Sequence, residues 1–195
     1  WFGTQDGLNK YNGYDNDMIV YKHDPMDTNS LSNNWIDCLY EDSKGIIWAG
    51  TRGGGLNAIN PFLNKIIRFE NDLGKVRSIS SNQVKCILED GDGTYWVGTT
   101  NGLNSFNGKT NIFDKYIHDP NDTTGIRGFK VGFIYEDKKA RLWISTLDGG
   151  LNLFDKRKKT FTCYVNHSDS IKNESESDNL VKSIAIELIV RSLLL

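Results

Sequence analysis

Hydrophobic residues occur in short runs of five or six positions, separated by polar turns rich in Gly, Asp and Asn. Apolar residues at the three-to-four spacing of an amphipathic helix do not appear before Leu180. Four short runs fill each stretch of 47 or 48 residues, which is the proportion of a β-propeller blade made of four antiparallel strands. The pattern therefore predicts an all-β chain.

Tryptophan marks the repeat. Trp1, Trp48, Trp96 and Trp143 are separated by 47, 48 and 47 residues, which gives about four blades. The neighbouring sequence recurs as W-F-G-T-Q-D-G-L-N, W-A-G-T-R-G-G-G-L-N, W-V-G-T-T-N-G-L-N and W-I-S-T-L-D-G-G-L-N. We expect the rings of Trp48, Trp96 and Trp143 to fill the wedge between neighbouring blades, where a large ring buries much apolar surface.

Each blade is expected to contain four strands, named a to d in chain order. Strand b holds the Trp, and strand d is an aromatic run. The a–b links D-S-K-G and D-G-D-G end in a Gly suited to a tight hairpin. The predicted ranges are 36–41, 84–89 and 131–136 for strand a; 46–51, 94–99 and 141–146 for b; 56–60, 103–107 and 151–155 for c; and 65–70, 111–117 and 160–165 for d.

Composition excludes several classes of protein. With 23 Lys+Arg against 25 Asp+Glu, the net charge of −2 lacks the cationic excess of a nucleic-acid-binding protein. Three cysteines cannot all pair within the chain and none forms a C-x-x-C pair, which argues against a disulfide framework or structural zinc. The most apolar stretch, 184–195, contains Glu187 and Arg191 and is too short to span a bilayer.

Candidate chemistry is sparse. The G-x-S-x-G, H-E-x-x-H, P-loop and dinucleotide-binding motifs do not occur. His23 and His118 occupy the same position in different blades, so they are not expected to share a metal or form a catalytic pair. Cys38 and Cys86, at matched strand-a positions, are interpreted as small buried hydrophobic residues. We therefore expect no enzymatic activity, no cofactor and no metal.

Two D-P-x-D turns contain short carboxylates that are interpreted as caps of free turn amides. Their spacing also suggests calcium, but a calcium site needs more oxygen ligands than one such turn supplies. The residues concerned are Asp24, Asp27, Asp119 and Asp122.

The positions that differ between repeats indicate a ligand site. In propellers the b–c and d–a loops emerge on one face, around the mouth of the central channel, where ligands bind. An aromatic ring and planar polar groups on this rim suit a polyhydroxylated ligand; the alternative is ordinary variation of solvated loops. The candidate ligand-binding residues are Trp35, Arg52, Gln83, Asn101, Lys130 and Asp148.

Several motifs together resemble the two-component regulator propeller repeat. They are W-x-G-T-x-x-G-L-N, the upstream E-D-x-x-G, the Y-x-H-D-P turn, and the lead-ins at 30–34 and 78–82. The resemblance implies the periplasmic sensor region of a Bacteroides-type hybrid histidine kinase, in which seven-bladed propellers precede the kinase and many detect oligosaccharides. This chain would then be a ligand-sensing segment. The alternatives are a protein-interaction or structural propeller, and a streptogramin-lyase-like enzyme, which would need a His/Glu cluster at the channel mouth.

The repeats are expected to cover residues 1–187, with blade boundaries near 1–33, 34–81, 82–128 and 129–178 and a divergent tail at 188–195. Because repeats suited to seven blades do not close at four, we expect an open arc whose free edges favour self-association. The 179–187 segment begins as a strand a but lacks the hairpin Gly and the Trp, and is interpreted as a fragment end or a domain edge. Phe129 in the lead-in and Ser145 in place of the W-x-G-T glycine predict an altered rim or interface in the last blade.

Overall fold

The structure, a computed structural model, describes residues 1–108, 110 and 112–164. These residues form four antiparallel sheets, and they contain no helix that is long and apolar enough to cross a lipid bilayer. Each sheet is a meander whose neighbours in sequence are neighbours in space. The strands are β1 (Phe2–Thr4), β2 (Gly7–Asn12), β3 (Asp17–Tyr21), β4 (Ile36–Glu41), β5 (Ile47–Thr51), β6 (Leu56–Asn60), β7 (Lys65–Phe69), β8 (Val84–Glu89), β9 (Tyr95–Thr99), β10 (Gly102–Phe106), β11 (Asp114–Tyr116), β12 (Val131–Glu136), β13 (Leu142–Thr146), β14 (Gly150–Asp155) and β15 (Thr160–Tyr164).

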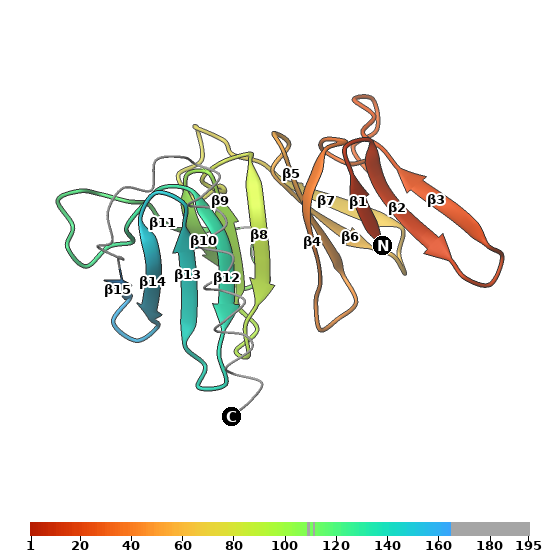
Figure 1. Cartoon of the computed structure of the whole chain (residues 1–195). Coiled ribbons are helices and arrows are strands. Elements are labelled where there is room, and N and C mark those ends of the chain that lie inside the picture. Colours follow the sequence, from red (N-terminus) through yellow and green to blue (C-terminus); the bar gives the residue numbers. More distant parts are fainter. Residues whose placement is uncertain (109, 111, 165–195) are drawn as a thin grey trace.

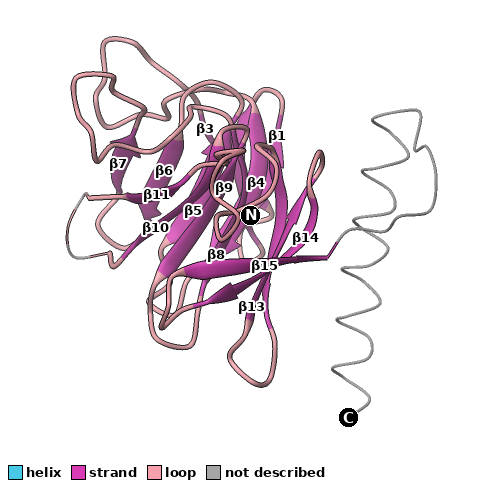
Figure 2. Ribbon diagram, turned by 90° about the vertical axis from the view of Figure 1, so that its left-hand side faces the viewer, coloured by secondary structure: helices cyan, strands magenta, loops and turns pink. Residues whose placement is uncertain are grey.

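The sheets follow one another in chain order as the blades of a partial propeller. We call β1–β3, β4–β7, β8–β11 and β12–β15 blades 1 to 4. Consecutive blades contact one another through β1 and β4, β4 and β8, and β8 and β12. Blades 1 and 4 lie at opposite ends of the described chain (Figure 1), and a view from the side shows the same blades joined by loops (Figure 2). The predicted all-β, partial propeller is confirmed, and its described residues form an open arc.

Most strand bounds agree with the sequence prediction to within one residue, but β11 does not. It spans only Asp114–Tyr116, whereas strand d of this blade was expected over 111–117. The Phe113 ring packs between Phe69 and Phe106, 5.8 and 4.7 Å away between centroids, and its backbone N–H donates to the Arg77 carbonyl at 2.9 Å. Phe161 of blade 4 makes the matching contacts within the five-residue strand β15. These contacts therefore join neighbouring blades and do not account for the shorter β11.

Residues 165–195 lie outside the described residues. The predictions that fall there are the strand a near 179–187, the end of the last blade at 178 and the tail at 188–195.

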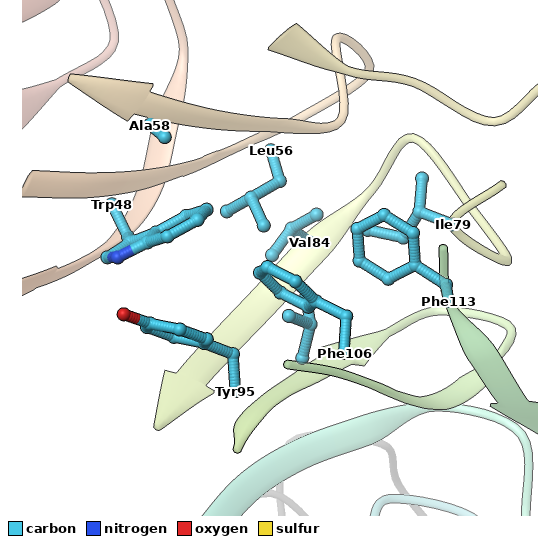
Figure 3. Close-up of a cluster of buried hydrophobic side chains, with 9 residues drawn as sticks. Trp48, Leu56, Ala58, Ile79, Val84, Tyr95, Phe106 and Phe113 are labelled. Atoms are coloured by element: carbon cyan, nitrogen blue, oxygen red, sulfur yellow. The ribbon is translucent and has the colours of Figure 1, made fainter. Parts of the chain in front are cut away.

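The hydrophobic core lies in the seams between blades. Trp48 of blade 2 contacts Tyr95 and Phe106 of blade 3, with ring centroids 4.9 and 5.4 Å away (Figure 3). Trp96 of blade 3 makes the matching contact with Phe154 of blade 4 at 5.2 Å. Trp48 and Trp96 are 5% and 4% exposed, so burial of these rings joins one blade to the next. The predicted role is confirmed for Trp48 and Trp96, whereas Trp143 is only partly buried and its ring contacts Tyr164 of its own blade.

An aspartate accompanies each buried tryptophan. The indole N–H of Trp48 donates to Asp42 at 2.9 Å, and those of Trp96 and Trp143 donate to matching aspartates. The same Asp42 carboxylate accepts the backbone N–H groups of Lys44 and Ile46, both at 2.9 Å, and so closes the a–b hairpin. The aspartate thus binds both the indole and the hairpin backbone, which explains why an aspartate recurs six residues before Trp48, Trp96 and Trp143.

The repeated glycine of strand b has a packing role. A Cβ atom on Gly50 would lie 2.6 Å from Cγ1 of Val84 in the next blade, and one on Gly98 would lie 2.6 Å from Cγ1 of Val131. Glycine therefore admits a valine side chain of the neighbouring blade. In blade 4, Ser145 takes this position, and its buried hydroxyl has no hydrogen-bond partner among the described residues.

Candidate functional site

The b–c turns and the d–a loops meet at one end of the blades, and we call this end the rim. Within each of blades 2 to 4, the b–c turn donates a backbone hydrogen bond to the residue that precedes strand a. The threonine before each turn closes it; Thr51 Oγ1, for example, donates to Gly55 O at 2.8 Å. The turn-to-strand bonds join Arg52 N to Trp35 O (3.0 Å), Thr100 N to Gln83 O (3.1 Å) and Leu147 N to Lys130 O (2.9 Å).

The rim continues from blade to blade through a second set of backbone bonds. In each case an N–H of the b–c turn reaches the d–a loop that enters the next blade. Together the two sets link all four described blades, so the six predicted ligand-binding residues lie along one rim. The bonds join Gly7 N to Asn34 O (2.8 Å), Gly53 N and Gly55 N to Asn82 O (both 2.9 Å), and Gly102 N to Phe129 O (2.6 Å).

Three of the predicted residues come together at the seam between blades 2 and 3. The Arg52 guanidinium lies 4.1 Å from the centroid of the Trp35 ring. Arg52 also forms an isolated β-bridge with Gln83 of the next blade. One face of Trp35 is therefore covered by the guanidinium, and the two side chains present a joint surface.

Two further residues complete this group, which we call the charged rim cluster: Trp35, Asp37, Arg52, Gln83 and Lys85. Asp37 accepts from Arg52 Nη2 at 3.2 Å and from Lys85 Nζ at 2.6 Å. Burial of Asp37 opposes its ionisation, but the hydrogen bonds and charges of Lys85 and Arg52 outweigh this effect and lower its pKa. The carboxylate thus holds a cation from each of two blades.

Sequence reasoning missed Asp37 and Lys85, although a signal was present. Both occupy the second position of strand a in consecutive repeats. Opposite charges at matched positions of neighbouring blades face each other across a seam when the strands that carry them pack together, as β4 and β8 do. Comparing repeats for charge complementarity would have found the pair.

The other three predicted residues, Asn101, Lys130 and Asp148, lie farther along the rim and make local contacts. Asn101 donates its side-chain amide to Ser80 O at 3.4 Å. Asp148 accepts the backbone N–H groups of Phe129 and Lys130 at 3.0 and 3.2 Å. Asp148 therefore caps the entry to β12 and holds Lys130 at the head of that strand.

The rim of blade 4 differs from those of blades 2 and 3. Asn34 and Asn82 accept the backbone N–H groups of His23 and Asn71 at 2.7 and 2.6 Å. Phe129 occupies the matching position in blade 4 and cannot accept such a bond. Its ring instead meets His118 edge-on, with 5.0 Å between centroids. The departure seen in the sequence thus replaces a polar brace with an aromatic contact.

The histidines and cysteines make structural contacts. Nδ1 of His23 lies 2.6 Å from Leu31 O, and Nδ1 of His118 lies 2.9 Å from Ile126 O, so each ring braces its own loop. Burial raises the pKa of the Cys38 thiol to about 12 and also raises that of Cys86, which disfavours the reactive thiolate. Within the described ranges, His, Cys, Asp and Glu side chains form no group that could hold a metal ion.

The carboxylates of the two D-P-x-D turns cap turn amides, as predicted. Each of the four accepts the N–H of the residue two positions later. The bonds are Met26 N to Asp24 (2.8 Å), Asn29 N to Asp27 (2.8 Å), Asn121 N to Asp119 (2.9 Å) and Thr124 N to Asp122 (2.9 Å).

A cleft of about 550 Å³ opens elsewhere, between blades 3 and 4 at the end that carries the a–b and c–d turns. Its aromatic lining includes Trp96 and Phe154, which already form the seam. Most of the charged groups around it pair with one another: Arg77 with Asp114, and Lys156 with three carboxylates. We therefore place the candidate site on the rim, where exposed polar groups of two blades converge.

Comparisons with known proteins agree with this geometry. A family model described as "Two component regulator propeller" matches residues 30–53 and 78–101, the segments that contain Trp35, Arg52, Gln83 and Asn101. A comparison with curated protein sequences finds no match. These two segments thus match the two-component regulator propeller repeat, as the sequence motifs predicted.

Two solved structures from B. thetaiotaomicron are similar to this chain. One is the extracellular domain of the hybrid two-component system BT3049, with 25% identity and a TM-score of 0.69 over 89% of this chain. The other is the extracellular domain of the hybrid two-component system BT4673, with 22% identity and a TM-score of 0.66 over 84% of this chain. The match spans only 23% of each of those chains.

Proposed function

We propose that this chain is a ligand-sensing propeller segment of a two-component signal-transduction receptor, and that its rim binds an oligosaccharide. In this proposal the segment is not an enzyme and needs no cofactor. It lies in the periplasm or outside the cell, and a histidine kinase elsewhere in the parent protein carries the signal onward. The similarity to the extracellular domain of BT3049 supports the receptor assignment.

The observation that carries the binding proposal is the charged rim cluster. It presents an aromatic ring, a guanidinium and an ammonium from two blades around one seam. N–H donors of this kind hydrogen-bond the hydroxyl groups of a sugar, and aromatic surface packs on its C–H groups. Backbone hydrogen bonds hold the supporting turns in place, so the site is formed before the ligand arrives.

Titration calorimetry of the 195-residue chain against a panel of neutral and acidic oligosaccharides tests the proposal. Trp35→Ala and Arg52→Ala are expected to weaken binding at least tenfold, while Arg77→Ala, a surface arginine paired with Asp114, serves as the matched control. Binding that is unchanged in both rim variants, or absent for every saccharide, contradicts the oligosaccharide assignment.

A second candidate function, a protein-interaction scaffold, is favoured by the outer face of blade 1. Four apolar side chains that β1–β3 direct away from blade 2 are about half exposed: Phe2 (57%), Tyr11 (49%), Met18 (49%) and Val20 (48%). An exposed apolar sheet face of this kind favours association with a second copy of the chain. Size-exclusion chromatography with light scattering tests this, because a monomer at every concentration would rule it out.

The streptogramin-lyase-like alternative finds no support in the described residues. That chemistry would need histidine and glutamate side chains together at the channel mouth. His23 and His118 instead brace the d–a loops of separate blades through carbonyl contacts.

A further inference from the structure

The charged rim cluster has an unequal charge balance. Its single carboxylate, Asp37, is shared by two cations, Arg52 and Lys85. One carboxylate neutralises one of them, so the cluster retains one positive charge. The chain as a whole has a net charge of −2, so this positive site is a local feature and not a reflection of composition.

The exposed fractions of the Arg52, Lys85 and Asp37 side chains show that the positive charge faces solvent. Arg52 and Lys85 side chains are 47% and 30% exposed, whereas that of Asp37 is only 9% exposed. The carboxylate therefore lies beneath the two cations and holds them at the surface. An incoming ligand meets the cationic groups before it meets the acid.

The guanidinium is held with one edge outward. Arg52 uses Nε and Nη2 toward Asp37, at 3.4 and 3.2 Å. Its plane lies over the Trp35 ring, which restricts rotation of the side chain. Because the five N–H groups of arginine form a rigid planar fork, the edge that carries Nη1 points away from Asp37. Such a donor edge matches the oxygens of a carboxylate or a sulfate.

The neighbouring blade lacks this arrangement. Thr100 stands at the position of Arg52 in blade 3, and Leu147 stands there in blade 4. Gly132 of blade 4 occupies the strand-a position that Asp37 holds in blade 2 and Lys85 holds in blade 3. The paired cations therefore occur at the seam between blades 2 and 3 and not at the seam between blades 3 and 4.

We infer that the rim recognises an acidic oligosaccharide, and that Arg52 and Lys85 bind its carboxylate or sulfate group while Trp35 supports the guanidinium. This inference rests on the proposed function, because it specifies the ligand class of the same site. Asp37 acts as a positioning residue that presents both cations to the ligand.

Matched ligands with and without charge provide the test. For the carboxylate arm, calorimetry compares galacturonate oligosaccharides with their methyl esters, which have the same chain without the charge. For the sulfate arm, it compares carrageenan oligosaccharides with the same oligosaccharides after chemical desulfation. We expect the charged member of at least one pair to bind at least tenfold more tightly, and this preference to decrease in high salt.

Variants assign that preference to the cluster. Arg52→Gln and Lys85→Gln are each expected to reduce the preference for the charged ligand about tenfold, while Arg77→Gln leaves it unchanged. Arg52→Lys keeps the charge but loses the planar fork, so it should recover part of the affinity. Circular dichroism and the unfolding midpoint identify any variant that is misfolded. If Arg52→Gln misfolds, Lys85→Gln tests the charge preference independently.

The possible outcomes separate this inference from the proposed function. Equal binding of charged and neutral saccharides overturns the acidic-ligand inference but leaves oligosaccharide binding intact. A preference that survives both Arg52→Gln and Lys85→Gln places the anion site elsewhere and also overturns the inference. If no saccharide of either kind binds, the proposed function and the inference both fail.

Discussion

Two seams, between blades 2 and 3 and between blades 3 and 4, contain the same buried acceptor but different donors. In each seam, a buried aspartate accepts the indole N–H of a tryptophan and also contacts a donor from the next blade. At the first seam, the Tyr95 hydroxyl donates to Asp42 Oδ2 at 2.8 Å. At the second, Lys156 Nζ lies 2.7 Å from Asp90 Oδ2. A neutral donor serves one seam and a cation the other.

A single position of strand b explains why the donor is a hydroxyl at one seam and an ammonium at the other. Leu142 of blade 4 stands where Tyr95 stands in blade 3, and a leucine has no hydroxyl to donate. Lys156, from the turn after β14, contacts Asp90 in place of a tyrosine hydroxyl. Its ammonium also contacts Glu136 and Asp92 at 2.8 and 3.1 Å. These carboxylates raise the pKa of Lys156 despite its partial burial. The repeat thus retains the acceptor and lets the donor come from another part of the blade.

A glutamate at the end of strand a is common to both seams. Glu89 accepts the backbone N–H of Ser43 at 2.8 Å, and Glu136 accepts that of Gly91 at 2.7 Å. Each bond crosses from one blade to the a–b turn of the blade before it. The two seams therefore share this brace, so variants of the donor side chains isolate the difference between them.

The largest expected effect comes from removing the ring at a seam. Trp96→Ala should lower the free energy of unfolding by about 4 kcal/mol, because it leaves a cavity and removes one donor from Asp90. Urea denaturation measures the change. Trp143→Ala is the matched control, since that ring is only partly buried and should cost less. Equal losses would contradict the seam-based core.

Lys156→Met should come next, with a loss of about 3 kcal/mol, because it leaves Asp90 and Glu136 without their shared cation. The free energy of unfolding of the wild type should also decrease at high salt, because salt screens the ion pairs of Lys156. Urea denaturation at low and high NaCl measures both quantities. A Lys156→Met chain with undiminished stability would show that the charged contact contributes nothing.

Tyr95→Phe should have a smaller effect, about 1 kcal/mol, because Asp42 keeps the indole donor and two backbone donors. Its effect should be nearly independent of salt, unlike that of Lys156→Met. The same denaturation series at two NaCl concentrations compares the two variants. A strong salt dependence in Tyr95→Phe would remove the distinction between a neutral and a charged seam.

The smallest effect is expected from mild acid. Burial opposes ionisation of Asp42 and Asp90, but their hydrogen bonds, and Lys156 in the case of Asp90, lower the pKa of both. A lowered pKa contributes stability that is present above the unfolded value of about 3.9 and is lost as the pH falls through the folded value. Urea midpoints measured as the pH decreases below about 4 should therefore decline.

Asp90→Asn tests the assignment of this acid response. The amide does not titrate, so the variant should be less stable at neutral pH and should show a shallower decline in acid than the wild type. An identical decline in both chains would assign the acid response to other carboxylates.

Much of the fold could be predicted because its determinants lie within one repeat. The strand bounds of β4, β6, β8 and β12 follow from short hydrophobic runs and turn glycines, and the role of Trp48 and Trp96 follows from their spacing. The prediction failed at β11, which has three residues where seven were expected, although Phe113 packs in its seam as Phe161 of the longer β15 does. Three of the rim candidates, Trp35, Arg52 and Gln83, were found by their variation between repeats.

The sequence by itself determined the repeating meander and the capped turns, because each depends on residues a few positions apart. It also marked the core tryptophans, because their spacing of 47 or 48 residues is visible without the structure. Only the tertiary structure decided which side chains meet between blades. Lys85 and Asp37 are 48 positions apart and Lys156 and Asp92 are 64 apart, so their contact depends on how one blade packs on the next. Packing across the seams also covered one face of Trp35 with Arg52 and buried Asp37 beneath two cations, which turned a variable rim into a cationic site.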